Sequence, residues 1–288
     1  VALYHEPNFV LKPFDGPTVT TVHDLSHLAH PEFHPAERVR YLCKMLPKTL
    51  EQASHVLAVS RFTRDELVRV FGMDGKKITV TPLAAASRFR PLTEAEAGPV
   101  LARFSLAWKR YVLTAATLEP RKNLDGLVAA FLRLPAALRR TFPLVFVGAR
   151  GWRERSFSRQ LEHLLSQGEA RMLGYLPDEE LPALMAGCRC FAYVSWYEGF
   201  GLPVLEAQAC GTPVVTSNLS ALPEIAGPGC LLVAPDDTDA ITAALQQGIE
   251  DELLAKIAAV EGPLWAAQFS WERTGDATLA AYRCALGG

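Results

Sequence analysis

Short apolar segments that favour strands alternate with helical stretches along most of this 288-residue chain. The strand-like segments are rich in Val, Leu and Ala and lack regularly spaced polar residues, which is typical of parallel strands buried on both faces. Helices must then cover both sides of each sheet. The alternation therefore predicts an α/β fold made of doubly wound parallel sheets.

Two series of such segments are separated by a stretch of weak pattern at 84–100. The predicted strands are 18–25, 55–60 and 77–83 in the first series, and 110–117, 142–148, 170–176, 188–195, 212–217 and 230–234 in the second. The predicted helices are 36–52, one between Ser60 as N-cap and Gly72 as C-terminal glycine, 123–134, 153–167, 178–187, 203–210 and 237–249.

This pattern predicts two Rossmann-like domains, 1–91 and 92–269. The first shows only about three strands and is expected to be truncated at its N-terminus. A closing helix is predicted at 270–288, with Ser270 as its N-cap and Arg273 at the third helical position.

The composition is that of an ordinary globular protein, 49% hydrophobic and 21% charged. No apolar run approaches the ~18 residues of a membrane-spanning helix. The start lacks an initiator Met and the features of a signal peptide, so we expect a preceding segment to be missing. Residues 1–91 carry 12 Lys and Arg against 9 Asp and Glu. Ordinary solvated surfaces explain this mild excess better than an anionic acceptor or a membrane surface, although both remain open.

Six cysteines are scattered without a spaced framework. Only Cys188 and Cys190 lie close together, in an apolar run where they are interpreted as small buried hydrophobes rather than as a metal or redox pair. A reducing cytoplasm is the compartment that fits this cysteine usage best.

The segment WYEGFGLPVLEAQACGTPVV, residues 196–215, concentrates chemistry in a short space. It follows a predicted strand and opens a helix, the position at which parallel sheets bind ligands. Gly199 and Gly201 allow close approach of backbone N–H groups, and the helix N-terminus favours a phosphate. Glu198 and Glu206 can each accept hydrogen bonds from two sugar hydroxyls. The segment therefore predicts a ligand with a central phosphate and a hydroxylated ring on each side, such as a nucleotide-sugar.

The sequence EGFGLPVLE resembles the E-x7-E motif of retaining glycosyltransferases of family 4, which have the GT-B fold. The resemblance extends over most of the chain. It includes TVHDLSHLAHPEFHPAERVR, VLAVSRFTRDEL, LEPRKNLDGLVAAF, LGYLPDEELPALMAGC and GTPVVTSNLSALPEIAG, and the subgroup it favours is that of bacterial O-antigen and exopolysaccharide mannosyltransferases. The resemblance implies a GT-B fold of two Rossmann-like domains facing a cleft, with the helix 270–288 crossing back onto the N-terminal domain.

The resemblance also implies residue roles. Glu198 would bind donor-sugar hydroxyls and Glu206 the ribose hydroxyls, while Arg121 and Lys122 would neutralise the leaving diphosphate. The helix that starts near Leu202 would assist the two cations. His23 would lie beside the donor sugar. The substrate-binding set implied is Glu198, Gly199, Phe200, Gly201, Leu202, Glu206, Gly174, Tyr175 and Leu176, the last segment lining the base.

His23, His27, His30 and His34 recur at a spacing that would place them along one side of a helix and could bind a metal. Pro31, Pro35 and the predicted strand at 18–25 argue against that helix. Arg121, Lys122 and a helix end already supply positive charge, so we expect a metal-independent enzyme without a cofactor other than the donor.

The function that the resemblance implies is transfer of a hexose, specifically mannose from GDP-mannose, to a glycan or lipid-linked glycan. Retention by front-face attack is expected, and no nucleic acid is expected as a partner. The location implied is cytoplasmic, with peripheral contact at the inner face of the plasma membrane left open. The family's N-terminal glycine-rich loop is not found in residues 1–20, so a non-catalytic nucleotide-sugar-binding protein remains the alternative. A phosphorylase-like enzyme would need a pyridoxal-phosphate lysine that we do not identify.

Overall fold

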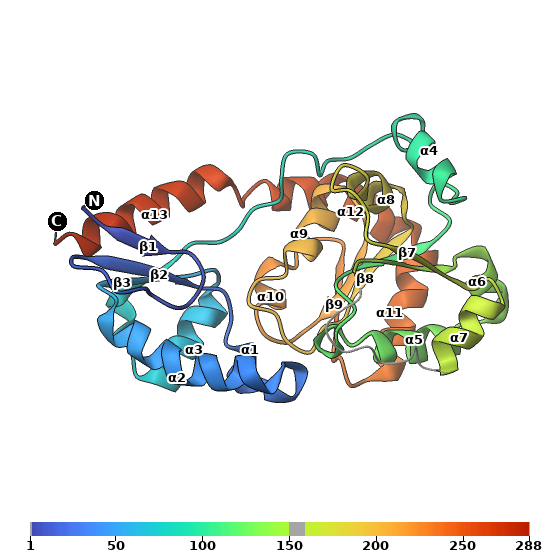
Figure 1. Ribbon diagram of the computed structural model, residues 1–288. Helices are drawn as coiled ribbons and strands as arrows, with labels where there is room; N and C mark the ends of the chain where they lie inside the picture. Colours follow the sequence, from blue (N-terminus) through green and yellow to red (C-terminus); the bar gives the residue numbers. More distant parts are fainter. Residues whose placement is uncertain (1, 150–158, 288) are drawn as a thin grey trace. The chain divides into compact units, whose positions relative to one another are not determined.

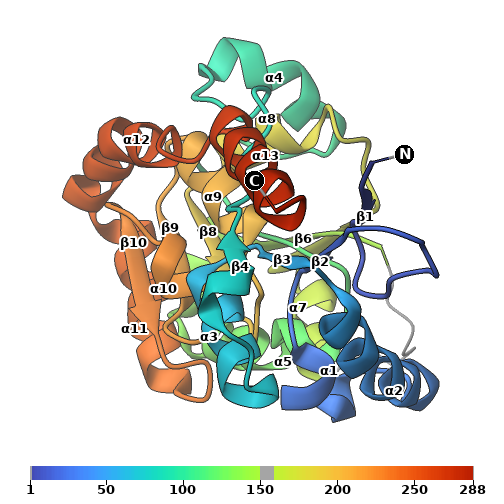
Figure 2. The same cartoon turned by 90° about the vertical axis from the view of Figure 1, so that its left-hand side faces the viewer.

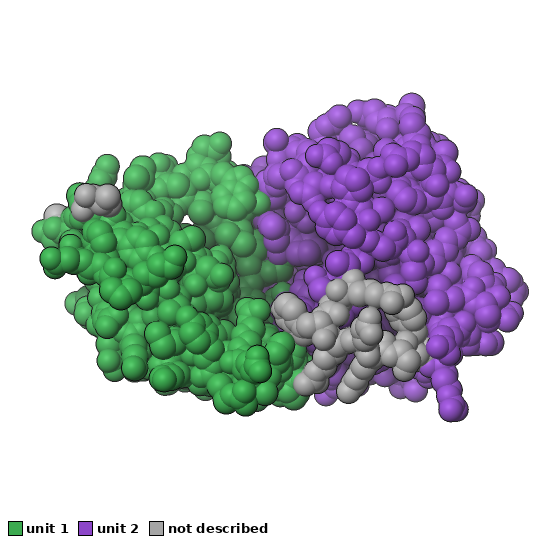
Figure 3. All heavy atoms as spheres, in the orientation of Figure 1, with its two compact units in different colours: residues 1–84, 197–201, 269–288 green, residues 85–196, 202–268 purple. Residues whose placement is uncertain are grey.

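The computed structural model describes residues 2–149 and 159–287, and it contains two parallel sheets with helices between the strands (Figure 1). By contacts the chain divides into two compact units (Figure 3). Unit 1 consists of Val1–Ala84, Tyr197–Gly201 and Phe269–Gly288, and unit 2 of Ala85–Trp196 and Leu202–Gln268. Compared with the domains expected from the sequence, residues 85–91 group with unit 2, and residues 197–201 and 269 group with unit 1. No helix within the described residues has the length and apolar character needed to span a membrane.

Unit 1 contains a four-stranded parallel sheet in the order β1-β2-β3-β4. Its strands are β1 (Tyr4–Glu6), β2 (Thr18–Val22), β3 (His55–Ala58) and β4 (Ile78–Val80). The helices of this unit are α1 (Ser26–Ala29), α2 (Ala36–Gln52), α3 (Arg61–Phe71) and α13 (Trp271–Ala285).

Alternate residues of the unit 1 strands point into two different apolar clusters. Val56 and Ala58 of β3 pack with Leu46 of α2 and Leu67 of α3. Leu57, between them in the chain, packs instead with residues of α13. Figure 2 shows α2 and α3 on one side of this sheet and α13 on the other. Successive strand residues alternate in direction, so the apolar run of β3 buries both of its faces.

Local sequence signals set the ends of the helices in unit 1. The Ser60 side chain accepts a hydrogen bond from the Thr63 N–H and caps α3, and Gly72 ends this helix with a left-handed φ of 65°. The Ser270 side chain accepts from the Arg273 N–H at 3.2 Å and caps α13. Both N-caps and the terminal glycine confirm the sequence prediction.

Unit 2 contains a six-stranded parallel sheet in the order β10-β9-β8-β5-β6-β7. The strands are β5 (Val112–Ala115), β6 (Leu144–Val147), β7 (Ala170–Gly174), β8 (Cys190–Tyr193), β9 (Val214–Ser217) and β10 (Cys230–Val233). Numbered within the unit, this order is the 3-2-1-4-5-6 arrangement of a doubly wound sheet.

Helices cover both faces of the sheet in unit 2. One face packs against α5 (Leu124–Arg133), α7 (Arg159–Ser166) and α11 (Thr238–Glu250) around an apolar cluster that includes Phe131, Phe146 and Ile241. The other carries α8 (Leu181–Gly187), α9 (Leu202–Ala209), α10 (Leu222–Ile225) and α12 (Glu252–Ala266). The predicted helix 153–167 lies outside the described residues at 153–158.

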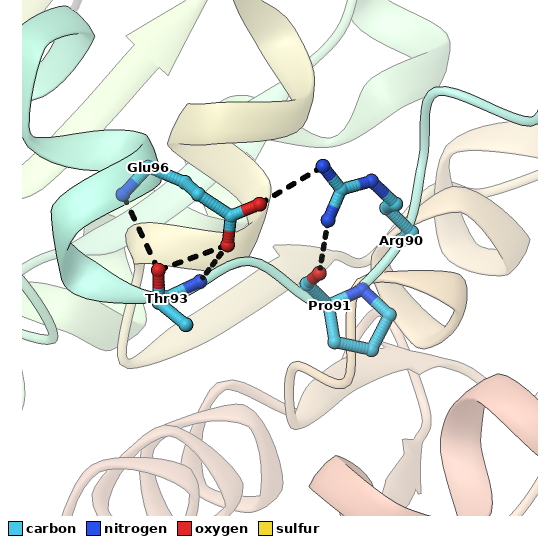
Figure 4. Close-up of polar contacts among 4 residues, drawn as sticks. All are labelled: Arg90, Pro91, Thr93 and Glu96. Atoms are coloured by element: carbon cyan, nitrogen blue, oxygen red, sulfur yellow. Dashed lines mark hydrogen bonds and ion pairs between the residues drawn. The ribbon is translucent and has the colours of Figure 1, made fainter.

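Several elements were missing from the sequence prediction. Strand β1 was not predicted, nor were α1, α6 (Ala136–Thr141), α10 and α12. The stretch 84–100 contains the start of α4 (Glu94–Arg103). Figure 4 shows its capping box, in which Thr93 Oγ1 accepts from the Glu96 N–H and the Glu96 carboxylate accepts from the Thr93 N–H. These hydrogen bonds, together with the ion pair to Arg90, hold the pKa of Glu96 down at about 2.

Candidate functional site

The strand order of unit 2 reverses direction between β5 and β8. The chain leaves β5 for β6 on one side, whereas it leaves β8 for β9 on the other. In doubly wound sheets, ligands bind beyond the carboxyl ends of the two strands at such a point. The segments that follow these two strands, 116–123 and 194–201, are therefore where the fold predicts a binding site.

The basic pair lies on the segment that follows β5. Arg121 and Lys122 occupy a 3-10 turn, Pro120–Lys122, just before the following helix. Asn123 adopts a left-handed φ of 54° and connects this turn to α5. The turn thus presents both cations at the carboxyl edge of the sheet.

Two contacts join this turn to β8 and the residues after it. Lys122 Nζ donates a hydrogen bond to the Tyr193 hydroxyl at 2.6 Å and also lies over the Tyr193 ring. The Trp196 N–H donates to the Arg121 carbonyl at 2.9 Å. The two segments at the switch point are therefore held together within unit 2.

Arg121 forms an ion pair with Glu119 at 2.8 Å, and both side chains are largely buried. This partner was not anticipated from the sequence. A bidentate guanidinium can bind a carboxylate and still donate to an anionic ligand through its remaining N–H groups. Glu119 therefore orients Arg121 and lowers its effective charge at the same time.

Glu206 lies in the second turn of α9 and is 9% exposed. No hydrogen bond to its carboxylate is formed within residues 2–149 and 159–287. Burial raises the pKa of this carboxyl to about 7, and Asp178 contributes in the same direction while Arg88 opposes it. The side chain is largely buried, but its oxygens are not among the described side-chain atoms that are fully buried without a partner, so a ligand that supplies donors can still reach the carboxylate.

Gly174, Tyr175 and Leu176 lie at the carboxyl end of β7, an edge strand separated from β5 by β6. Gly174 has a left-handed φ of 72°, and its carbonyl accepts from the Gly148 N–H at 2.8 Å. Tyr175 is 73% exposed. This segment is on the same edge of the sheet as the cations but belongs to a different loop.

The segment Tyr197–Gly201, which carries Glu198, groups with unit 1 by its contacts. A Cβ atom on Gly199 would lie 1.8 Å from the His23 carbonyl oxygen and 2.8 Å from the Asp24 Cβ. The Gly199 carbonyl accepts from Thr63 Oγ1 at 3.3 Å. The fold therefore places the backbone beside Glu198 directly against the carboxyl end of β2, where His23 lies.

The remaining residues of this segment are also buried. Glu198 is 6% exposed and Phe200 is 5% exposed. The Phe200 ring meets the Phe269 ring edge-on, with centroids 6.1 Å apart. Gly201 has a φ of 98°, which only glycine adopts readily, and Leu202 then begins α9.

His23 is half-buried at the end of β2. Its Nε2 lies 2.8 Å from the Pro7 carbonyl oxygen, so this nitrogen carries the proton in that hydrogen bond. The Phe9 ring lies edge-on to the imidazole at 5.9 Å. These contacts fix the ring orientation and leave Nδ1 as the nitrogen with acceptor capacity.

The four histidines weighed as metal ligands do not lie on one helix. His23 precedes α1, which spans only Ser26–Ala29, and His34 follows a 3-10 turn at Pro31–Phe33. His27 is buried with both ring nitrogens lacking a hydrogen-bond partner among the described residues, and burial lowers its pKa to about 4. The described part of the chain contains no cluster of three or more potential metal ligands.

The paired cysteines occupy different elements. Cys188 follows the end of α8, and Cys190 is the first residue of β8. Both are free and fully buried, and burial raises the pKa of Cys188 to about 12. They are packing residues of the unit 2 core.

The sequence of unit 2 matches the family profile described as glycosyl transferases group 1 over residues 103–262. The chain belongs to the group 1 glycosyltransferases. A second profile, described as Glycosyltransferase Family 4, matches residues 5–84. The two matches cover the sheet-forming parts of both units and confirm the family that the sequence motifs indicated.

Curated members of the family include two mannosyltransferases that resemble this chain. It is 44% identical over 281 residues to the O-antigen chain mannosyltransferase B of Escherichia coli, covering 98% of this chain and 74% of the relative. It is 30% identical over 270 residues to the serotype-specific mannosyltransferase WbdA of Escherichia coli, covering 89% of this chain and 32% of WbdA. The chain thus spans about three quarters of the first relative and about a third of the second.

Among solved structures, the fold resembles that of WaaG, a glycosyltransferase involved in lipopolysaccharide biosynthesis. The TM-score is 0.78 at 17% identity, over 96% of this chain and 76% of WaaG. At this identity the comparison speaks to the fold, which is the predicted GT-B class.

Proposed function

We propose that this glycosyltransferase transfers mannose from GDP-mannose to a glycan or lipid-linked glycan, with retention of the anomeric configuration. The mannosyl donor is supported by the 44% identity to an O-antigen mannosyltransferase. The observation that carries the proposal is the arrangement at the switch point of unit 2. There, the Lys122 cation meets the end of β8, Arg121 lies beside it in the same turn, and the E-x7-E motif begins five residues beyond that strand.

In this mechanism Arg121 and Lys122 bind the diphosphate and stabilise the negative charge that develops as it leaves. The N-terminus of α9 adds a partial positive charge at the same group. Glu206, ionised on binding, accepts hydrogen bonds from the two ribose hydroxyls. The ligand would thereby supply the donors that this buried carboxyl lacks in the described structure.

Glu198 and His23 act on the sugar in this proposal. Glu198 accepts hydrogen bonds from mannose hydroxyls, and His23 binds a hydroxyl through Nδ1 because Nε2 is engaged by the Pro7 carbonyl. No further carboxylate is assigned as a nucleophile, which favours attack by the acceptor on the face that the nucleotide leaves. Gly174, Tyr175 and Leu176 line the base in this proposal.

The proposed enzyme needs no metal, because cationic side chains and a helix terminus neutralise the diphosphate. It is expected to act in the cytoplasm, where nucleotide-sugars are available as donors.

The first test is thermal stabilisation of the protein by GDP, UDP and ADP, since a ligand that binds the folded state raises the melting temperature. We expect GDP to give the largest shift. Transfer from GDP-mannose should then persist in EDTA and give an α-linked product by NMR. Stronger stabilisation by another nucleotide would refute the donor. A β-linked product would refute retention. Loss of activity in EDTA that Mn²⁺ restores would refute metal independence.

A further inference from the structure

Tyr197, the residue before Glu198, is buried at 4% exposure in a segment outside regular secondary structure. Its hydroxyl makes two hydrogen bonds to residues far away in sequence. It donates to the carboxylate of Glu66 on α3, and it accepts from the Leu25 N–H at 3.2 Å. Leu25 is two residues beyond His23, so one hydroxyl connects the Glu198 segment to the His23 segment.

Glu66 is also built into the fold. It is 8% exposed and forms an ion pair with Arg69 at 3.0 Å. A buried carboxylate is retained at a cost unless it has partners, and here the partners are Arg69 and the Tyr197 hydroxyl. The Phe62 and His30 rings meet the Tyr197 ring edge-on at 5.5 and 5.8 Å and restrict its rotation.

A second anchor lies on the other side of Glu198. The Gly199 carbonyl accepts from Thr63 Oγ1 at 3.3 Å, and Thr63 belongs to the first turn of α3. Ser60 Oγ, which caps this helix, also donates to Thr63 Oγ1 at 3.0 Å and fixes the threonine rotamer. The residues before and after Glu198 are therefore both hydrogen-bonded to α3, and Tyr197 is also bonded to the Leu25 N–H in the segment after β2.

We propose that Tyr197 and Glu66 are positioning residues that hold Glu198 in register with His23. The role of those two residues in sugar binding rests on the proposed function. The Tyr197 hydroxyl does not touch the reacting atoms. It acts by fixing the backbone of Tyr197–Gly201, so that the carboxylate of Glu198 meets the donor sugar without reorganisation of the loop.

The decisive variant is Tyr197→Phe, which keeps the ring packing and removes both hydrogen bonds. Without substrate, we expect the amides of 198–201 to exchange hydrogen at least tenfold faster. With substrate, we expect kcat to fall about tenfold or more while the Kd for GDP stays within twofold. Tyr41→Phe is the matched control because Tyr41 is 55% exposed on α2. It should leave the exchange rate of 198–201, kcat and the Kd for GDP unchanged.

Glu66 gives an independent test. Glu66→Gln retains an oxygen that can accept from the Tyr197 hydroxyl, whereas Glu66→Ala does not. We expect Gln to preserve slow exchange and most of kcat, and Ala to reproduce the Tyr197→Phe effect. Unchanged exchange of 198–201 in Tyr197→Phe, whatever its kcat, would overturn the proposal. Because exchange is measured without substrate, it tests the anchoring even if GDP-mannose proves not to be the donor.

Discussion

Lys122 Nζ and the Tyr193 hydroxyl are 2.6 Å apart, and this hydrogen bond joins the turn after β5 to the last residue of β8. The two residues are neighbours because β5, which precedes the turn with Lys122, pairs with β8 at the centre of the sheet. The contact holds a cation at the point where a doubly wound sheet reverses its strand order. It orients Lys122 toward the site without neutralising it, since a tyrosine hydroxyl carries no charge.

Lys122→Ala should reduce transfer sharply, because it removes a cation from the leaving diphosphate. Loss of a charged hydrogen bond costs about 1.5–3 kcal/mol, or roughly 10- to 150-fold in kcat/KM. Tyr193→Phe should give a smaller loss, since the cation remains and only its orientation is released. Steady-state kinetics with GDP-mannose would measure both. Lys256→Ala, at an exposed position of α12, should leave kcat/KM unchanged. Equal kinetics in Lys122→Ala and wild type would remove Lys122 from the site.

Glu206→Ala and Glu198→Ala should have different effects, because one carboxylate is assigned to the ribose and the other to the reacting sugar. We expect Glu206→Ala to weaken GDP binding by about 1.5–3 kcal/mol, and Glu198→Ala mainly to lower kcat. Calorimetric titration with GDP, together with turnover measurements, separates the two. Unchanged GDP affinity in Glu206→Ala would exclude the ribose contact.

The titration of Glu206 should be visible in the stability of the folded protein. Burial raises its pKa from 4.5 to about 7. The stability that comes from the protonated carboxyl is therefore fully present below about pH 4.5 and is lost as pH rises through about 7. Glu206→Gln is neutral at every pH. Its melting temperature relative to wild type should rise between pH 5 and pH 8. A difference independent of pH would show that the carboxyl does not titrate in this range.

The sequence predicted the α/β class and most strands because the apolar runs of the strands are continuous. Recognisable caps such as Ser60 and Gly72 marked the ends of a helix between two strands. It missed α4 although Thr93 and Glu96 have the spacing of a capping box, because a proline and a glycine lie inside that helix and its apolar pattern is weak. Strand β1 has only three residues, too few for a pattern.

The sequence led to predictions for candidate site residues that lie in or beside a motif. It gave no indication of the hydrogen bonds that join distant segments of the chain. Arg121, Lys122, Glu198 and Glu206 were predicted as site residues from the chemistry of short stretches and from the family resemblance, and their roles stay predictions. The hydrogen bond between Tyr197 and Glu66 spans 131 residues, and nothing local to either residue indicates it. Burial of Glu206 likewise depends on the packing of α9, so its raised pKa could not be inferred from its place in the motif.

Gly199→Ala should abolish efficient transfer for a steric reason. A Cβ at this position would lie 1.8 Å from the His23 carbonyl oxygen and 2.8 Å from the His23 carbonyl carbon. These are backbone atoms at the end of β2, so a side-chain rotation cannot relieve the overlap, and the Glu198 segment or His23 must move. A misplacement of reacting groups by about 1 Å can cost about a hundredfold in rate, so we expect kcat to fall about a hundredfold. Gly275→Ala is the matched control: no atom lies within 4 Å of its added Cβ, and alanine at this exposed position of α13 should preserve kcat while raising stability slightly. Kinetics and thermal unfolding of the two variants, measured side by side, would test the assignment. Full activity in Gly199→Ala would mean that the segment can move away from His23 without consequence, and the pairing of Glu198 with His23 would then be rejected.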